Sequence, residues 1–64
     1  GAVRVDGWIA PGAAMVVELL LDGARLEVRS DDDGRFVLEA VPKGLARFAL
    51  HPDGRTVLSP AIEL

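Results

Sequence analysis

The run DDDGRFVLEAVPKG, from Asp31 to Gly44, constrains the fold of this chain more than any other stretch. An Asp-Gly pair between two alternating apolar runs is a strong turn signal, because glycine adopts positive φ without a clash and aspartate side chains bond the turn backbone. Apolar and polar residues alternate on both sides of it, which is the period of a half-buried strand. Pro42 and Gly44 then end the second strand, since proline lacks the N–H that a ladder needs.

The two strands around this turn place their inward residues at even positions. These residues are Leu26, Val28 and Ser30 before the turn and Phe36, Leu38 and Ala40 after it. If the two strands pair directly, the even-numbered residues of both stay on one face only when the loop has an odd number of residues. The loop 32–34 meets this condition best, with Gly34 left-handed at a bulge. That register sets Asp31 opposite Arg35.

The same stretch carries a family resemblance. The pattern S-D-x-D-G-R-F-x-L-x-x-V-P-x-G-L resembles the signature of carboxypeptidase regulatory-like domains. It is formed by Ser30, Asp31, Asp33, Gly34, Arg35, Phe36, Leu38, Val41, Pro42, Gly44 and Leu45. Val3, Val5, Gly7 and the strand 14–20 also fit, so the resemblance covers nearly the whole chain. The chain departs from the family in its shorter opening and in having Leu45-Ala46 where an aromatic often follows the glycine.

The resemblance implies a transthyretin-like (prealbumin-like) β-sandwich, near the collagen-adhesin B-type repeats. Its motifs specify a fold better than a function, and such domains usually accompany enzymes, receptors or surface proteins without an active site of their own. It also implies that the turn 31–34 can be a corner between two sheets instead of a closed hairpin. Spacing alone does not choose between the two.

The first half of the chain predicts two further strands. The first spans 3–9, with Val3 and Val5 inward, and is interrupted by Gly7 and by Pro11-Gly12; Pro11 confines this end to an edge or a loop. The second spans 14–21 and is too short and too rich in adjacent valines for a helix. The next turn, Asp22-Gly23, predicts a type I′ hairpin that pairs Leu19 with Leu26 and Val17 with Val28 and puts Met15 on the core face.

The second half of the chain continues this pattern. A strand over 45–51 is followed by a Pro-Asp-Gly turn at 52–54, and the last strand, 55–64, is broken at Ser59-Pro60. Together these elements predict an all-β fold, a small Greek-key β-sandwich of six to seven short, mainly antiparallel strands. We expect 1–64 to be one domain excised from a larger protein. The predicted core comprises Val5, Val17, Leu19, Leu26, Val28, Phe36, Leu38, Phe48 and Leu50.

Composition limits the partners. A net charge of −3 disfavours nucleic acid, which needs a basic face. No apolar run reaches the roughly 18 residues of a membrane helix, and no charged-then-apolar segment within the sequence suggests a secretion leader, so we expect no membrane insertion and leave the compartment open. Without cysteine the chain fits reducing and oxidising environments alike, and six Arg against one Lys suggest a GC-rich bacterial gene.

The polar residues indicate neither metal nor catalysis. Contiguous Asp-Asp-Asp-Gly lacks the alternating ligands of a calcium loop, so we expect a solvated turn in which Asp31 faces Arg35, with no cofactor. His51 is the one histidine, and with Ser59 it supplies no nucleophile, base and acid around a pocket. We therefore expect no enzyme, and a surface position for His51 at the end of its strand.

The candidate partner surface consists of exposed apolar residues. The alternation predicts that Val16 and Leu20, on either side of Glu18, point outward. With Val37 and Leu45 they would form one contiguous apolar patch, and the alternative is that arginine side chains cover it. Trp8 either contacts a partner or caps an open end of the sandwich, and the cap is favoured because buried aromatics dominate small cores.

Three functions follow from these observations. The first is a non-catalytic accessory or docking module that contacts other proteins or domains. The second is a self-associating structural module. The third is a carbohydrate-binding module, which is less favoured because sugar platforms use two or three exposed aromatics.

Overall fold

The structure is a computed structural model, and it describes residues 1–10 and 12–64. The role predicted for Pro11 lies outside the described residues. The elements in chain order are β1 (Ala2–Trp8), β2 (Val16–Leu21), β3 (Ala24–Arg29), β4 (Arg35–Pro42), β5 (Leu45–Leu50), the 3₁₀ turn η1 (Pro52–Gly54), β6 (Val57–Leu58) and β7 (Ile62–Glu63). Among the described residues, no helix has the length and apolar character needed to cross a bilayer.

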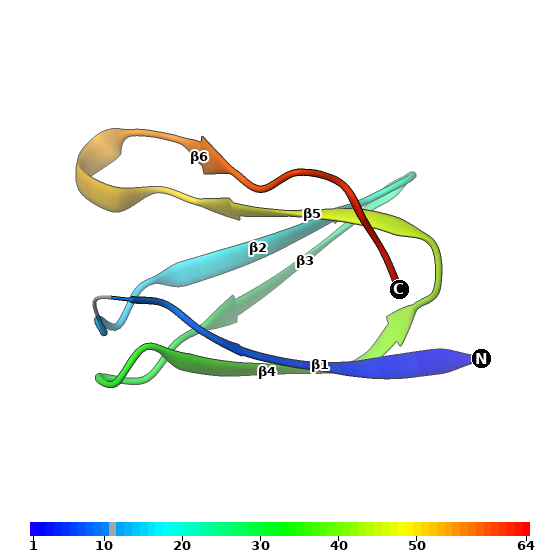
Figure 1. Ribbon diagram of the computed structural model, residues 1–64, viewed down its shortest axis with the longest axis horizontal. Coiled ribbons are helices and arrows are strands. Elements are labelled where there is room, and N and C mark those ends of the chain that lie inside the picture. Colours follow the sequence, from blue (N-terminus) through cyan, green and yellow to red (C-terminus); the bar gives the residue numbers. More distant parts are fainter. Residues whose placement is uncertain (11) are drawn as a thin grey trace.

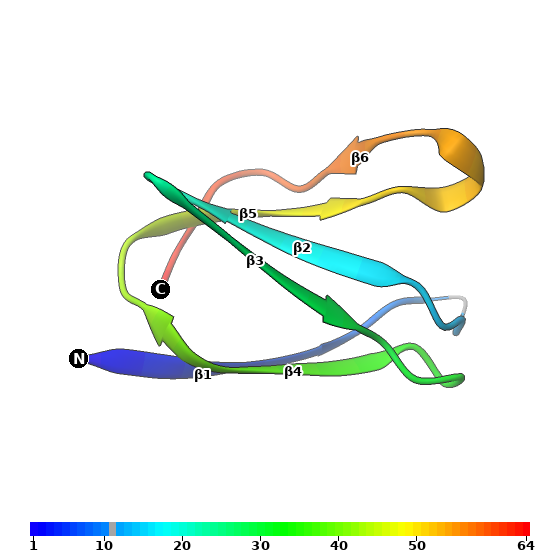
Figure 2. The same ribbon diagram turned by 180° about the vertical axis from the view of Figure 1, so that it is seen from behind.

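The strands form two packed layers of unequal width. β1 and β4 make a two-stranded sheet, and the second sheet has the order β3-β2-β5-β6, with β7 also pairing with β5. All pairs are antiparallel. Figures 1 and 2 show β1 and β4 as the lower layer and the wider sheet above it. The predicted small β-sandwich of six to seven strands is confirmed.

The β2–β3 hairpin has the predicted register but a different turn. Leu19 lies opposite Leu26 and Val17 opposite Val28, because a two-residue loop and the apolar pattern on both strands require the same pairing. Type I′ is wrong, since it needs positive φ at both loop residues. Gly23 has φ +75°, but Asp22 is not among the residues with positive φ.

The turn at 31–34 is a corner between the two sheets, because β3 and β4 belong to different layers. Its geometry is that of a tight turn: Gly34 N–H donates to the Asp31 carbonyl, and Asp31 N–H to the Arg35 carbonyl, both at 2.9 Å. Gly34 is left-handed as predicted, with φ +86°. The Asp31 carboxylate accepts the backbone N–H groups of Asp33 and Arg35, each at 2.9 Å. Asp31 lies opposite Arg35 as predicted, but its carboxylate holds the corner through backbone amides, and the predicted pairing with the Arg35 side chain is wrong.

A β-bulge changes the inward face of β4. Val5 lies opposite Leu38 but Val3 lies opposite Val41, so two residues of β4 face one residue of β1. Ala40, the second of these two, has φ +58°, a left-handed conformation that a regular strand does not contain. The predicted inward position of Ala40 is therefore wrong, and Val41 points into the core in its place with no exposed surface.

The C-terminal segment lies along one edge of β5 in two short pieces. β6 pairs with Ala49 and Leu50 and β7 with the first two residues of β5. Pro60 cannot donate to the ladder, and Ser59 maintains the pairing before it. The Ser59 N–H donates to the Phe48 carbonyl at 2.9 Å, and its hydroxyl accepts the Phe48 N–H at 2.8 Å. The predicted break at Ser59-Pro60 is confirmed.

The core is smaller than the sequence predicted. Its buried apolar residues are Val17, Leu19, Leu38, Val41, Ala46 and Ala49. Three of these were predicted. The other six predicted residues, which are Val5, Leu26, Val28, Phe36, Phe48 and Leu50, are half-buried. The narrow β1–β4 sheet covers only part of the wider one, so much of the apolar inner surface lies at the margin of the sandwich.

Candidate functional site

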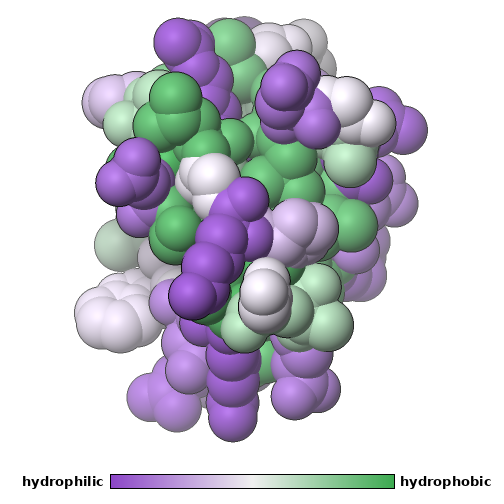
Figure 3. Space-filling model, turned by 90° about the vertical axis from the view of Figure 1, so that its right-hand side faces the viewer, coloured by the Kyte–Doolittle hydropathy of each residue, from purple (hydrophilic) through white to green (hydrophobic). Residues whose placement is uncertain are grey.

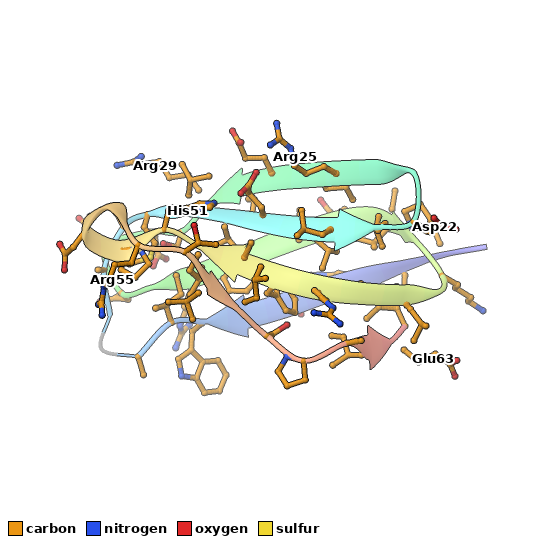
Figure 4. The ribbon with its side chains drawn as sticks, turned by 90° about the horizontal axis from the view of Figure 1, so that it is seen from above. Asp22, Arg25, Arg29, His51, Arg55 and Glu63 are labelled. Atoms are coloured by element: carbon orange, nitrogen blue, oxygen red, sulfur yellow. The ribbon has the colours of Figure 1, made fainter. Side chains whose placement is uncertain are left out.

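A cluster of charged and polar side chains lies on the outer face of the wide sheet. The carboxylate of Glu18, on β2, forms an ion pair with Arg25, with 2.9 Å between Glu18 Oε2 and Arg25 Nη1. Its other oxygen, Oε1, lies 2.5 Å from His51 Nε2. Thr56 Oγ1 lies 3.3 Å from the other ring nitrogen of His51. Figure 4 shows Arg25 and His51 on this same face. Both oxygens of the Glu18 carboxylate therefore have a partner, and the side chain is only 10% exposed.

The His51 contact explains the acidity of Glu18. Its hydrogen bond to His51 is the main cause that holds the pKa of Glu18 below its usual range; Arg25 acts in the same direction, and burial opposes both. The order Thr56, His51, Glu18 resembles a nucleophile, base and acid. However, Thr56 and His51 are exposed, and neither cavity described below includes them, so nothing keeps water from them. The cluster is best explained as a structural clamp between β2 and the end of β5.

The predicted partner residues do not form one surface. Val16, Leu20 and Leu45 lie on strands of the wide sheet, whereas Val37 and Trp8 lie on the narrow sheet. Their neighbours along each strand point inward, so these residues face outward from opposite sides of the sandwich. Leu20 is also half-buried. The prediction of a single contiguous patch is therefore wrong.

Charged residues separate the apolar residues of the wide sheet. Leu20 lies between Arg25 and Arg47 on the neighbouring strands, and Glu18 lies between Leu20 and Val16 along β2. The end of the molecule that carries the β2–β3 turn and the β4–β5 connection shows the same mixture, with green apolar areas divided by purple hydrophilic side chains (Figure 3). Long charged side chains beside aliphatic ones shield them from water.

Trp8 lies at the end of β1 and is 75% exposed. The cap predicted for it is wrong, because its ring stands at the margin of the sandwich and does not close it. Glycine, the smallest residue, precedes it, and Ile9 follows. The exposed ring gives this margin a large apolar surface with one N–H donor, which is typical of contact sites.

A cleft opens beside Trp8, between the two sheets. Its volume is about 540 Å³. The apolar residues that line it come from both layers and from the segment after β1, and they are Val5, Trp8, Ile9, Ala10, Val17, Phe36, Phe48, Leu50 and Ile62. The two phenylalanines meet edge to face, with ring centroids 5.7 Å apart. Four of the six half-buried residues of the predicted core therefore line an open apolar cleft; they are Val5, Phe36, Phe48 and Leu50.

The same side of the molecule leaves other apolar side chains uncovered. Val57 pairs with Leu50, and Ile62 with Ala46, so both face the narrow sheet. They are nevertheless 47% and 37% exposed. In the view from above, the blue strand β1 lies behind the wide sheet on the side of β6 and β7, and no strand among the described residues continues its sheet outward (Figure 4). We call this region, formed by β1, the cleft, Val57 and Ile62, the open side.

The outer surface of β1 carries a pair of opposite charges. Arg4 Nε lies 3.1 Å from Asp6 Oδ1, and both side chains are 63% exposed. With Trp8, Arg35 and Val37 they line a second depression, also of about 540 Å³. Two of the five predicted surface residues, Trp8 and Val37, therefore meet here, together with charged residues that the sequence prediction had not included.

Comparisons with known proteins give no relative: no protein-family model, no curated protein and no solved structure matches this chain. In the part of the chain that the structure describes, no group of three or more His, Asp or Glu side chains is placed to hold a metal ion.

Proposed function

We propose that this domain is a non-catalytic accessory module that contacts other proteins or domains through the open side of its sandwich. The observation that carries this proposal is the unequal width of the two sheets. It leaves Val57 and Ile62 exposed although both face inward. Exposed apolar surface of this kind usually marks a contact site.

Two further features support the open side as the contact surface. Trp8 stands beside the cleft with most of its surface exposed, and tryptophan is enriched at the energetic centres of protein interfaces. The edge of β1 has no neighbouring strand among the described residues, so its peptide groups are free to pair with an added one. The resemblance to carboxypeptidase regulatory-like domains, which are accessory modules, agrees with this role.

A carbohydrate-binding function has less support. Sugar platforms use several exposed aromatic rings, and the sequence has one Trp and no Tyr. Its two phenylalanines pack against each other at the cleft. Trp8 alone does not make such a platform.

Photo-crosslinking in the natural full-length chain tests the proposal. A photoreactive benzoylphenylalanine replaces Trp8 on the open side, and in a matched variant it replaces Arg29, which is exposed on the outer face of β3. We expect a defined protein or interdomain adduct from position 8 and little from position 29. Adducts that are equally weak at both positions would contradict the proposal.

A further inference from the structure

The pairing of β1 with β4 determines which peptide groups of β1 point to its free edge. Ile9 N–H donates to the Gly34 carbonyl at 2.8 Å, in continuation of the β1–β4 pairing. Hydrogen-bonded and non-hydrogen-bonded pairs alternate in an antiparallel ladder. The peptide groups of the odd-numbered residues of β1 therefore point toward β4, and those of the even-numbered residues point outward at the free edge.

A second β1 strand can pair antiparallel to this edge only if even residues face even residues. In a two-fold arrangement the axis then passes through one residue of β1, which faces its own copy. An axis at Val5 sets Arg4 of each copy opposite Asp6 of the other. Both side chains lie on the same exposed face, so the two cross-strand pairs are attractive.

The neighbouring registers lack this complementarity. An axis at Arg4 places the two Arg4 side chains opposite each other, and an axis at Asp6 does the same for the two carboxylates. Like charges directly opposite each other destabilise a strand pair. The charges of β1 thus select the axis at Val5 among the two-fold pairings near the middle of the strand.

The inner face of the strand fits the same register. Val5 meets Val5 of the second copy, and Val3 meets Gly7, so the inward positions bring together small or aliphatic residues. The added strand continues the narrow sheet outward on the side of β6 and β7, the strands on which Val57 and Ile62 are uncovered. It supplies the layer that the wide sheet lacks on this side.

We propose that the partner at the open side is a second copy of this chain, joined by antiparallel β1–β1 pairing about a two-fold axis at Val5. The result is a four-stranded sheet of order β4-β1-β1-β4 across the two copies. In it the Arg4–Asp6 pair within each chain is exchanged for two pairs between chains. This inference rests on the proposed function, since it names the partner that the open side contacts.

Disulfide trapping tests the register. At a non-hydrogen-bonded antiparallel pair the Cα atoms lie about 4.5 Å apart, within the range of a disulfide. The chain has no cysteine, so Val5→Cys in the full chain should give a covalent dimer under mild oxidation. Val3→Cys is the matched control, because it lies on the same face of β1 but faces Gly7 of the second copy. Equal crosslinking of both variants, or none of Val5→Cys, would overturn the register.

Charge reversal tests the partner independently. Arg4→Asp alone and Asp6→Arg alone each place two like-charge pairs in the interface, and each should weaken self-association by about tenfold or more, as measured by analytical ultracentrifugation. Mixing the two variants creates a heterodimer in which every pair is again attractive, so association should return. A native chain that sediments as a monomer at millimolar concentration, or a mixture that stays monomeric, overturns the dimer.

The outcomes separate this inference from the proposed function. Adducts at position 8 with a different protein, together with a monomeric native chain, contradict the dimer but leave the contact module standing. The absence of adducts together with a monomeric chain contradicts both. Adducts at position 8 between two copies, with trapping at position 5, support both.

Discussion

The ring of Phe36 lies over the backbone of Gly7, its direct partner on the neighbouring strand. A Cβ added at Gly7 would lie 2.6 Å from Phe36 Cζ, a distance that real Cβ atoms do not tolerate. The ring also packs edge to face on Phe48, which limits how far it can move. The absence of a side chain at Gly7 therefore leaves the space that the Phe36 ring occupies when it packs on Phe48 at the cleft.

Gly7→Ala should destabilise the domain by about 1–2 kcal/mol, because overpacking outweighs the entropy that the alanine removes from the unfolded chain. Urea unfolding measures the effect. Gly1→Ala is the control, since nothing lies within 4 Å of its added Cβ. In a Phe36→Leu background, which lacks the Cζ atom, the cost of Gly7→Ala should fall. A Gly7→Ala variant as stable as the native chain would contradict the packing described here.

The corner glycine provides a second prediction. Gly34 has φ +86°, and its added Cβ would lie 2.5 Å from the Ile9 carbonyl oxygen, which belongs to the backbone and cannot swing aside. Gly34→Ala should cost on the order of 3 kcal/mol or more, since left-handed strain and a clash act together. Gly23→Ala separates the two effects, because Gly23 has φ +75° but nothing within 4 Å of its Cβ position.

We expect Gly23→Ala to cost only about 1 kcal/mol, the strain alone. Thermal melts of the two variants in parallel provide the measurement. If both variants melt at the same temperature, the approach of Gly34 to the end of β1 contributes nothing, and the corner is not packed as described.

The bulge provides a third prediction. Ala40→Gly should stabilise the domain by about 0.5–1 kcal/mol, because it relieves an alanine at φ +58°. Ala24→Gly, at an ordinary strand position on β3, should destabilise it. A loss of stability in Ala40→Gly equal to that in Ala24→Gly would contradict the left-handed bulge.

The change of face at the bulge is tested by two valines of the same strand. Val41 has no exposed surface and Val37 is 40% exposed. Val41→Ala should therefore cost about 2 kcal/mol or more, and Val37→Ala well under about 1 kcal/mol. A regular strand without a bulge would place both valines outward, and the two costs would then be equally small.

Local patterns determined how much of this fold could be predicted. The β2–β3 register followed from a two-residue loop and matching apolar positions, which leave one consistent pairing. The bulge could not be predicted, because period two continues through Ala40 and nothing in the local sequence requires a left-handed alanine there. The corner at 31–34 depends on which sheet each strand joins, a choice that spacing does not determine.

The candidate site shows the same limit. The contact between Glu18 and His51 joins residues 33 apart in sequence, and only the pairing of β2 with β5 brings them together. Glu18 is a carboxylate in the most apolar strand of the sequence, and this was the signal that could have indicated a paired, largely covered side chain. The exposure of Trp8 depends on the narrowness of the β1–β4 sheet, a property of the whole topology.

The last prediction concerns Glu18 and pH. The hydrogen bond to His51 and the charge of Arg25 hold the pKa of Glu18 in the folded chain below its ordinary value of 4.5. A carboxyl group with a lowered folded pKa stabilises the fold fully above its unfolded pKa, and this contribution disappears as the pH falls through the folded pKa. Glu18→Gln keeps the shape but not the charge, so it should be less stable than the native chain at pH 7. The difference should shrink as the pH falls below about 4.5.

Urea unfolding at a series of pH values from about 7 to about 3 measures this difference across the range in which a carboxyl group titrates. Glu63→Gln, which removes an exposed carboxylate on β7, is the control and should lie close to the native chain throughout. His51→Gln provides a second arm, because it removes the main cause of the lowered pKa while Arg25 remains. In the His51→Gln background, Glu18→Gln should therefore cost less stability at pH 7 than it does in the native chain. A native-minus-Glu18→Gln difference that stays constant over the whole pH series would show that the ionised carboxylate does not stabilise the clamp between β2 and β5.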